Sequence, residues 1–159
     1  MRVTDTHIFF WGEEFSNWYD CVINYKGHVF DNTEQIFMWE KAMFFKDTET
    51  AGRILKVGNP SMAKKLGRQV KNFDSVLWLL PSYQFMVDAN VEKFTQNEYL
   101  KKKLLETGTK MLVEASPYDT IWGIGLGEAD DAILDEKNWK GLNLLGKALM
   151  DVRNIIKNQ

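Results

Sequence analysis

Two carboxylates and an indole surround a proline-started turn in residues 114–127, a segment that ends in closely spaced glycines. Asp119 and Trp122 lie between Pro117 and Gly123. Proline and glycine restrict such a turn at its two ends, so both side chains should point in fixed directions. Fixed polar groups beside an aromatic ring suit a substrate pocket, although Asp119 can equally cap the turn and Trp122 can fill the core. Two further polar clusters favour the pocket.

The second cluster, residues 33–41, contains a carboxylate and an amine seven positions apart. Glu34 and Lys41 would lie on one face of an α-helix, within ~20° of each other and ~10 Å apart along the axis. They can flank a ligand there. Each also has a structural interpretation, because Asp31 and Glu34 have capping-box spacing and most lysines are exposed.

The third cluster begins the last predicted helix, where unpaired backbone N–H groups bind anions or sugar oxygens. Asn143 is its main candidate, with a plain helix cap as an equal alternative. Two further positions add polar groups: Asn17 lies between aromatic residues, and Arg68 follows Gly67. The planar guanidinium of Arg68 can bind two phosphate oxygens at once.

The residue inventory removes whole reaction classes. The only histidines are His7 and His28 and the only cysteine is Cys21, so no cluster has zinc spacing and a Ser-His-Asp or Cys-His mechanism has few candidate bases. We expect no metal and no cofactor, and catalysis by carboxylates, lysines and bound water.

Length and charge predict one soluble domain, residues 1–159. The 159 residues are 45% hydrophobic and 13% aromatic, enough for one core. The formal net charge of −2 gives no global positive field, so we expect no tight binding to unmodified nucleic acid. A single cysteine, no apolar leader and no run of ~18 apolar residues predict a cytoplasmic protein without membrane contact.

Residue patterns predict an α+β fold, mainly helical, with a few short antiparallel strands. Expected strands are residues 8–11, 21–25, 28–30 and 111–115. Expected helices are residues 33–46, 47–57, 61–70, 81–94, from a capping box at 95–98 to 108, and 141–156.

Two glycine motifs resemble nucleotide-binding loops without their context. Gly141 to Lys147 fits a P-loop up to its lysine, but Ala148 follows where magnesium needs Ser or Thr, and no apolar strand precedes it. Gly123-Ile-Gly-Leu-Gly127 lacks dinucleotide spacing, and the carboxylates after it would repel pyrophosphate. We reject both.

An ordered series of short motifs resembles the NADAR, or YbiA-like, family. It covers nearly the whole chain, from Phe9 to Ile156: Phe15-Ser-Asn17, Thr33-Glu34-Gln, Lys41-Ala, Leu66-Gly67-Arg68, Lys93-Phe94, Leu112-Val-Glu114-Ala-Ser, Asp119-x-x-Trp122-Gly123 and Gly141-x-Asn143-x-x-Gly146. The resemblance implies N-glycosidase activity on phosphoribosylamine compounds. Two implied substrate classes are riboflavin-pathway pyrimidine intermediates and ADP-ribose attached to guanine. The chain departs from the common pattern at Gln35, where many relatives have histidine, and at Val76-Leu-Trp78, where Asp-Trp is frequent; the first substitution could alter substrate choice.

The resemblance, together with residue type, gives each candidate a role. Glu34 would stabilise positive charge on the sugar, Lys41 would capture C1′ as a Schiff base, and Asp119 would donate a proton or hold sugar hydroxyls. Predicted substrate contacts are Asn17, Trp39, Arg68, Glu114, Trp122, Gly123 and Asn143. Two alternatives stay open: a module that binds ADP-ribose or NAD without cleaving it, and a partner-binding helical protein.

Overall fold

The computed structural model describes all 159 residues and has an α+β fold of six α-helices and five short strands. The backbone forms two compact units, which are described separately. Unit 1 comprises Met1–Ser16 and Glu98–Gln159, and unit 2 comprises Asn17–Asn97. The single domain expected from the length stays a prediction.

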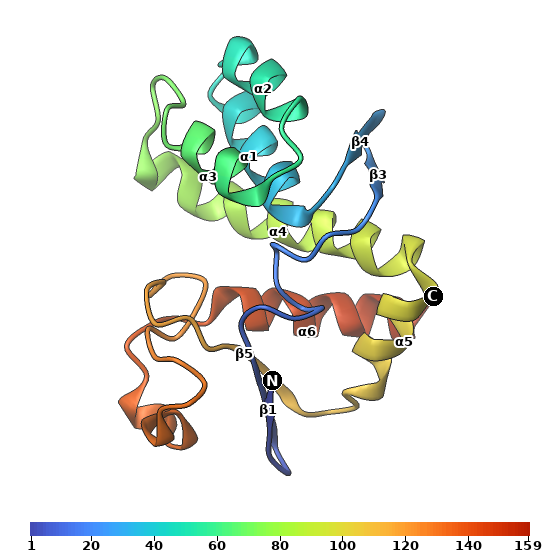
Figure 1. The fold of residues 1–159 in the computed structure, drawn as a ribbon, viewed down its shortest axis with the longest axis vertical. Coiled ribbons are helices and arrows are strands. Elements are labelled where there is room, and N and C mark those ends of the chain that lie inside the picture. The colour runs from blue at the N-terminus through green and yellow to red at the C-terminus, as the bar shows by residue number, and fades with distance from the viewer. The chain divides into compact units, whose positions relative to one another are not determined.

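Unit 2 is built from four helices, each of which begins at a side chain that caps it. In Figure 1, α1 packs against α2, α3 and α4. Asn32, Asp47, Asn59 and Asp74 each accept a hydrogen bond from a backbone N–H in the first turn of their helix, the interaction that satisfies groups without an intrahelical partner. The helices are α1 (Thr33–Phe44), α2 (Thr48–Leu55), α3 (Pro60–Gly67) and α4 (Ser75–Gln96).

A two-stranded hairpin completes unit 2. Strands β3 (Ile23–Tyr25) and β4 (His28–Phe30) pair antiparallel, and Lys26 and Gly27 between them both have positive φ. Two positive φ angles at the centre of a two-residue turn match the right-handed twist of the strands. The break expected between strands 21–25 and 28–30 is therefore a two-residue turn.

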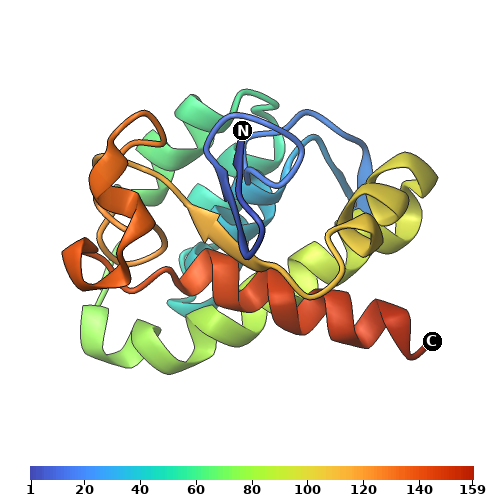
Figure 2. The same cartoon turned by 90° about the horizontal axis from the view of Figure 1, so that it is seen from below.

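Unit 1 contains a three-stranded sheet, two helices and two 3₁₀ turns. Figure 2 shows α6 lying along β5. The sheet has the order β1-β2-β5, and the antiparallel pairing expected from the sequence holds for β1 with β2, whereas β5 runs parallel to β2. A parallel pair needs a long crossover, and here about a hundred residues separate its two strands. The elements are β1 (Arg2–Val3), β2 (His7–Phe10), α5 (Glu98–Glu106), β5 (Met111–Glu114), η1 (Asp131–Leu134), η2 (Glu136–Asn138) and α6 (Leu144–Lys157).

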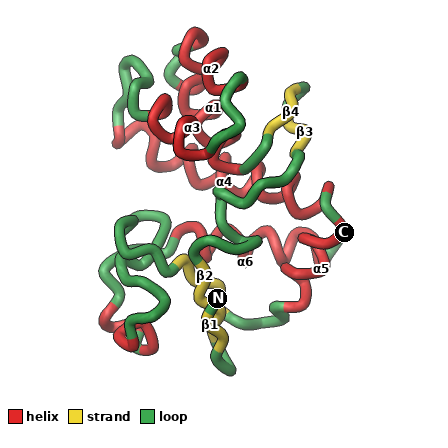
Figure 3. The backbone as a smooth tube through the Cα atoms, in the orientation of Figure 1, coloured by secondary structure: helices red, strands yellow, loops and turns green.

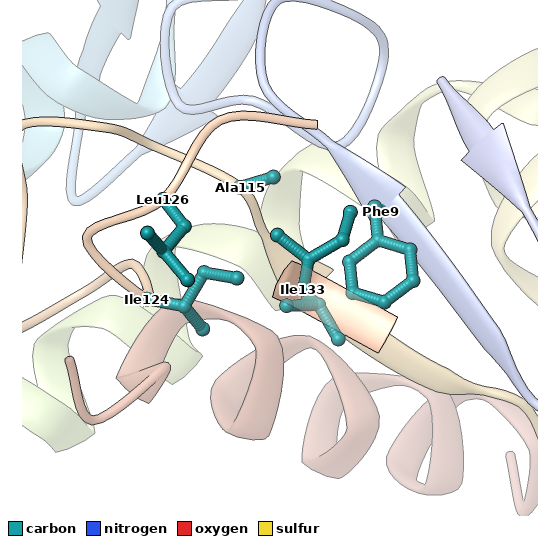
Figure 4. Packing of buried hydrophobic residues seen from close by; sticks show 6 residues of the cluster. Phe9, Ala115, Ile124, Leu126 and Ile133 are labelled. Carbon is teal, nitrogen blue, oxygen red and sulfur yellow. The ribbon is translucent and has the colours of Figure 1, made fainter. Parts of the chain in front are cut away.

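A hydrophobic cluster joins the sheet of unit 1 to the long connection before α6. Its residues come from β2, from β5 and the residue after it, and from the connection, as Figure 4 shows. The core of this unit therefore fixes a segment with little regular structure, drawn mostly as loop in Figure 3. The buried residues are Phe9, Val113, Ala115, Ile124, Leu126 and Ile133.

Glycines of the rejected P-loop pattern allow close backbone packing. A Cβ atom on Gly146 would overlap the carbonyl oxygen of Leu112, and one on Gly141 would overlap that of Gly123. A residue without a side chain is needed where backbones approach this closely. Gly146 therefore lets α6 pack closely on β5, and Gly141 lets the end of the connection pack closely on Gly123.

Several predicted helix boundaries were wrong, among them the end of α3, which is Gly67 rather than residue 70. Helix α4 begins at Ser75 rather than at Pro81, which lies inside it. Pro81 has no backbone N–H to donate to the carbonyl of Leu77, four residues earlier. Leu77 is exposed, so water can hydrogen-bond to that carbonyl instead. Thr95 makes no capping box, because α4 continues and its hydroxyl donates to the carbonyl of Val91. Helix α6 begins three residues later than expected, after a left-handed Asn143.

Candidate functional site

Glu34 lies in the first turn of α1, which Asn17 holds in place. The backbone N–H of Glu34 donates to the carbonyl of Asn17 at 3.0 Å, and the Thr33 hydroxyl donates to the Asn17 Oδ1 at 3.0 Å. The Asn17 amide nitrogen donates to the sulfur of Met86. Glu34 is only 8% exposed, so its carboxylate is in a poorly solvated position. These contacts of Asn17 give it a part in positioning Glu34.

Lys41 is half-buried near the end of the same helix, and its surroundings change its basicity. Burial lowers the pKa of the Lys41 amine below its ordinary value, and the nearby guanidinium of Arg68 lowers this pKa as well. The charge of Glu34 acts in the opposite direction. Glu34 and Lys41 thus lie within electrostatic reach of each other, as their seven-residue spacing predicted, and Arg68 joins them.

Arg68 reaches this position because α3 packs tightly on α1. A Cβ atom on Gly67 would overlap the side chain of Met38, so a larger residue at the end of α3 would force that side chain to move. Arg68 follows as the C-terminal cap of that helix and is exposed to solvent. The structure therefore brings together three of the predicted site residues of unit 2: Glu34, Lys41 and Arg68.

Gln35, expected to affect substrate choice, has its amide occupied inside unit 2. It is 1% exposed, its Oε1 accepts from the N–H of Asp31 at 2.8 Å, and its Nε2 donates to the carbonyl of Ile54 at 3.0 Å. These bonds tie the start of α1 to the end of α2. Its side chain can influence substrate choice only by positioning its neighbours.

Trp39, predicted to contact substrate, is a buried aromatic residue of unit 2. It is 7% exposed, and its ring packs edge-on against the rings of His28 and Phe30, with centroids 5.4 and 5.7 Å away. Tyr25 makes a third edge contact. These contacts join α1 to the hairpin, and they show a packing role for the indole.

Asp119, in unit 1, caps the turn that contains it. Its Oδ1 accepts hydrogen bonds from the N–H groups of Ile121 and Trp122 at 2.9 and 2.8 Å. The hydroxyl of Ser116 accepts another from the N–H of Asp119 itself. The turn thus has the fixed geometry expected from its sequence, and one carboxylate oxygen maintains it.

Asn143 connects β5 to the start of α6. Its Oδ1 accepts from the N–H of Glu114 at 3.0 Å, and its Nδ2 donates to the carbonyl of Leu112 at 3.0 Å. Its backbone N–H donates to the carbonyl of Gly123. The residue is 2% exposed and makes no side-chain cap on α6, so the alternative of a plain helix cap was wrong. Asn143 therefore fixes Glu114 and Gly123, two other predicted site residues, around one point of unit 1.

The predicted site residues thus form two groups, one in each unit. Asn17, Glu34, Trp39, Lys41 and Arg68 belong to unit 2, and Glu114, Asp119, Trp122, Gly123 and Asn143 belong to unit 1. A hollow of about 240 Å³ in unit 2 contains none of them. It is lined by Phe45, Lys46, Asp47, Thr48, Glu49, Lys71 and Asn72.

One neighbour of the amine was not singled out from the sequence. The Nζ of Lys41 lies 4.1 Å from the centroid of the Phe73 ring, within the range of a cation–π contact. The only local signal is that Phe73 stands between Asn72 and Asp74, a turn former and a helix cap. Nothing in that signal points to Lys41, thirty-two positions earlier.

Neither a metal cluster nor a membrane span occurs in the structure. No group of three or more His, Cys, Asp or Glu side chains is arranged to hold a metal ion. None of the helices has the length and hydropathy that crossing a membrane requires.

Comparison with known proteins yields one family and several relatives. The profile of the NADAR domain matches residues 9–157. An N-glycosidase of Acanthamoeba polyphaga mimivirus is 38% identical to this chain. The alignment covers 94% of this chain and 96% of that protein. A riboflavin biosynthesis protein of Vibrio vulnificus is 29% identical over 138 residues, which cover 87% of this chain but only 34% of that protein.

A solved structure shares the fold. The NMR structure of the E. coli protein YbiA aligns with a TM-score of 0.79 at 28% sequence identity, covering 99% of this chain and 88% of that one. The agreement extends over elements of both units.

Proposed function

Because the chain belongs to the NADAR domain family, we propose that it hydrolyses the bond between C1′ of a ribose phosphate and the nitrogen of a base. The chain is a hydrolase of N-glycosyl bonds, in line with the name of its mimiviral relative. The observation that carries the proposed mechanism is the pKa of Lys41, which burial and Arg68 lower. A lower pKa raises the fraction of unprotonated amine, the form that attacks carbon.

Lys41 acts as the nucleophile in this proposal. A ribosylamine opens its sugar ring when the C1′–O bond breaks, the ring oxygen takes a proton, and an imine forms between C1′ and the base nitrogen. The Lys41 amine adds to C1′, and the base nitrogen then leaves with a proton. The resulting Schiff base between C1′ and Nζ is hydrolysed by one water molecule, which releases the ribose phosphate and restores the amine.

Glu34 acts on the charge and the water. Each imine carries positive charge near C1′ when protonated, and a carboxylate in a poorly solvated position stabilises that charge more than bulk water would. The same carboxylate can accept a proton from the attacking water. Burial of Glu34 and its electrostatic effect on Lys41 support this role.

We propose a phosphorylated ribosylaminopyrimidine as the substrate, with ADP-ribosylated guanine as the second candidate. The Vibrio vulnificus relative, named for riboflavin biosynthesis, favours the first. The net charge of −2 also favours a small molecule, since a nucleic acid substrate gains affinity from a positive field. Arg68, exposed beside Lys41, is the proposed phosphate contact.

The test incubates the protein with each substrate and follows the released base and ribose phosphate by mass spectrometry. Glu34→Gln and Lys41→Ala should each abolish release and leave the melting curve cooperative. Lys64→Ala, which removes an exposed lysine of α3, is the matched control and should retain activity. Full activity in both site variants contradicts the mechanism. Binding of ADP-ribose without release of any product would instead support the non-catalytic module.

A further inference from the structure

An aromatic cluster reaches the protein surface beside Lys41. The rings of Phe44 and Phe45 each contact Trp78, with centroids 5.7 and 6.2 Å away, and Trp78 stacks on Phe85 at 5.7 Å. Phe45 also packs edge-on against Phe73 at 5.4 Å. Trp78 is buried, whereas Phe73 is 43% exposed and Phe44 is 41% exposed. The cluster therefore has a core part and an open part.

Phe73 is held firmly although it is exposed. The preceding residue, Asn72, has a φ of 63°, a left-handed conformation that asparagine tolerates better than most residues. The following residue, Asp74, caps α4 by accepting from the N–H groups of Val76 and Leu77. The loop between α3 and α4 thus has a restricted backbone at Phe73, and the contact with Phe45 restricts the ring itself. An exposed ring fixed in this way is preorganised to stack on a planar ligand.

The position of Phe73 relative to the amine identifies the ligand. Its ring centroid lies 4.1 Å from the Nζ of Lys41, and Phe45 supports its edge. In the proposed reaction C1′ binds to Nζ while the base nitrogen is still attached to C1′. Base and amine are then only two bonds apart, so the base starts within van der Waals reach of the ring.

We infer that Phe73, supported by Phe45, forms the subsite for the leaving base, where a planar pyrimidine or purine stacks while C1′ reacts at Lys41. This inference rests on the proposed function. It adds a specificity element, because a ribosylamine with an aliphatic leaving group would gain nothing from the ring. Stacking accepts any base with a π-face, so both candidate substrates can use the subsite.

The test compares three variants in steady-state hydrolysis of the ribosylaminopyrimidine phosphate and, separately, of ADP-ribosylguanine in an oligonucleotide. Phe73→Leu removes the aromatic face at similar volume, and Phe73→Tyr keeps it. Phe44→Leu is the matched control, because Phe44 is as exposed as Phe73 and belongs to the same cluster, but its ring contacts are with Phe45, Trp78 and Phe85. Phe73→Leu should raise KM about tenfold or more for the substrate that is hydrolysed, as expected for loss of base stacking. The other two variants should keep the KM of the unchanged protein.

A substrate without a base provides the second readout. Borohydride should trap ribose 5-phosphate on Lys41 in all three variants, because that adduct involves no leaving base. Trapping in Phe73→Leu also shows that the variant is folded. An unchanged KM in Phe73→Leu, or an equal rise in Phe44→Leu, overturns the inference while hydrolysis by the unchanged protein preserves the proposed function.

A failure of the proposed function can also be distinguished from a failure of the base subsite. If the unchanged protein hydrolyses neither substrate, the proposed function fails, and saturation-transfer NMR with guanosine tests the subsite alone. Transfer to the base protons that disappears in Phe73→Leu and persists in Phe73→Tyr would support a base-binding site. Equal transfer in both variants would overturn it.

Discussion

The backbone of Gly67 passes so close to Met38 that a Cβ atom at position 67 would overlap the methionine sulfur. Gly67 ends α3 on α1, and the next residue is Arg68, whose charge acts on Lys41. The absence of a side chain at Gly67 thus permits the contact with Met38 directly beside Arg68, which lowers the pKa of Lys41.

Gly67→Ala should destabilise the protein by about 1–3 kcal/mol, the usual cost of an added methyl group in a packed contact. Activity should fall too, because α3 would shift and move Arg68 away from Lys41. Urea unfolding measures the first effect and base release the second.

Gly52→Ala is the control for this substitution. Gly52 lies inside α2, and a Cβ atom there would meet nothing within 4 Å. Alanine favours a helix interior over glycine by about 0.5–1 kcal/mol, so this variant should be more stable than the unchanged protein. Equal effects of the two substitutions would contradict the packing explanation.

The pH dependence of Schiff-base formation should report the surroundings of Lys41. Only the unprotonated amine attacks, so the rate of borohydride trapping with ribose 5-phosphate should rise with pH through the pKa of Lys41. Burial and Arg68 lower this pKa, so the midpoint should lie below 10.5, the ordinary value for lysine. A midpoint at or above 10.5 would contradict the structure.

Two substitutions should move this midpoint in opposite directions. Arg68→Ala removes a positive charge that disfavours the ammonium form, so the midpoint should rise. Glu34→Gln removes a negative charge that favours the ammonium form, so the midpoint should fall. Midpoints are compared rather than maximal rates, because either variant can slow the chemistry. Shifts in the same direction would contradict the opposite effects of Arg68 and Glu34 on the pKa of Lys41.

Gln35→Ala should cost about 1–3 kcal/mol of stability, because it removes the Gln35 partner of the buried carbonyl of Ile54 and of the part-buried N–H of Asp31. Gln84→Ala is the matched control. Gln84 is exposed and bonds only to Asp88 one turn away, so its loss should change stability by less than about 0.5 kcal/mol. Thermal unfolding of both variants gives the comparison, and similar losses would contradict the buried role of Gln35.

Local signals in the sequence were sufficient for the elements of unit 2 that begin at strong caps. The helix starts predicted at residues 33 and 61 agree with α1 and α3 to within one residue, and Asn32 and Asn59 are the caps found there. The same approach misplaced α4, because Pro81 is an equally strong local signal and is overridden by packing of the long helix. A helix start depends on neighbouring residues, whereas tolerance of an internal proline depends on solvent and tertiary contacts.

Contacts between distant segments could not be predicted in this way. The spacing of Glu34 and Lys41 on one helix follows from helical geometry, and their electrostatic coupling agrees with it. The approach of Phe73 to Lys41 depends on how α3 packs on α1, which no residue pattern specifies. The hydrogen bonds of Asn143 to β5, about thirty residues earlier, likewise depend on tertiary packing that no residue pattern specifies.

Asn143 offers a separate test of unit 1, because it combines a left-handed backbone with two side-chain hydrogen bonds. Asn143→Gly permits the backbone conformation and loses both bonds, whereas Asn143→Ala loses both and must also adopt a left-handed conformation that costs about 1 kcal/mol for alanine. Asn143→Asp keeps an acceptor for the N–H of Glu114 but places a carboxylate against the carbonyl of Leu112.

All three variants should be less stable than the unchanged protein, since each unpaired buried group costs about 1–3 kcal/mol. Alanine should be less stable than glycine by about 1 kcal/mol, the reverse of their order in a helix interior. Asn158→Ala, at the exposed end of α6 with negative φ, should have almost no effect. Urea unfolding gives this order, and an alanine variant at least as stable as the glycine variant would show that the left-handed conformation at position 143 imposes no cost.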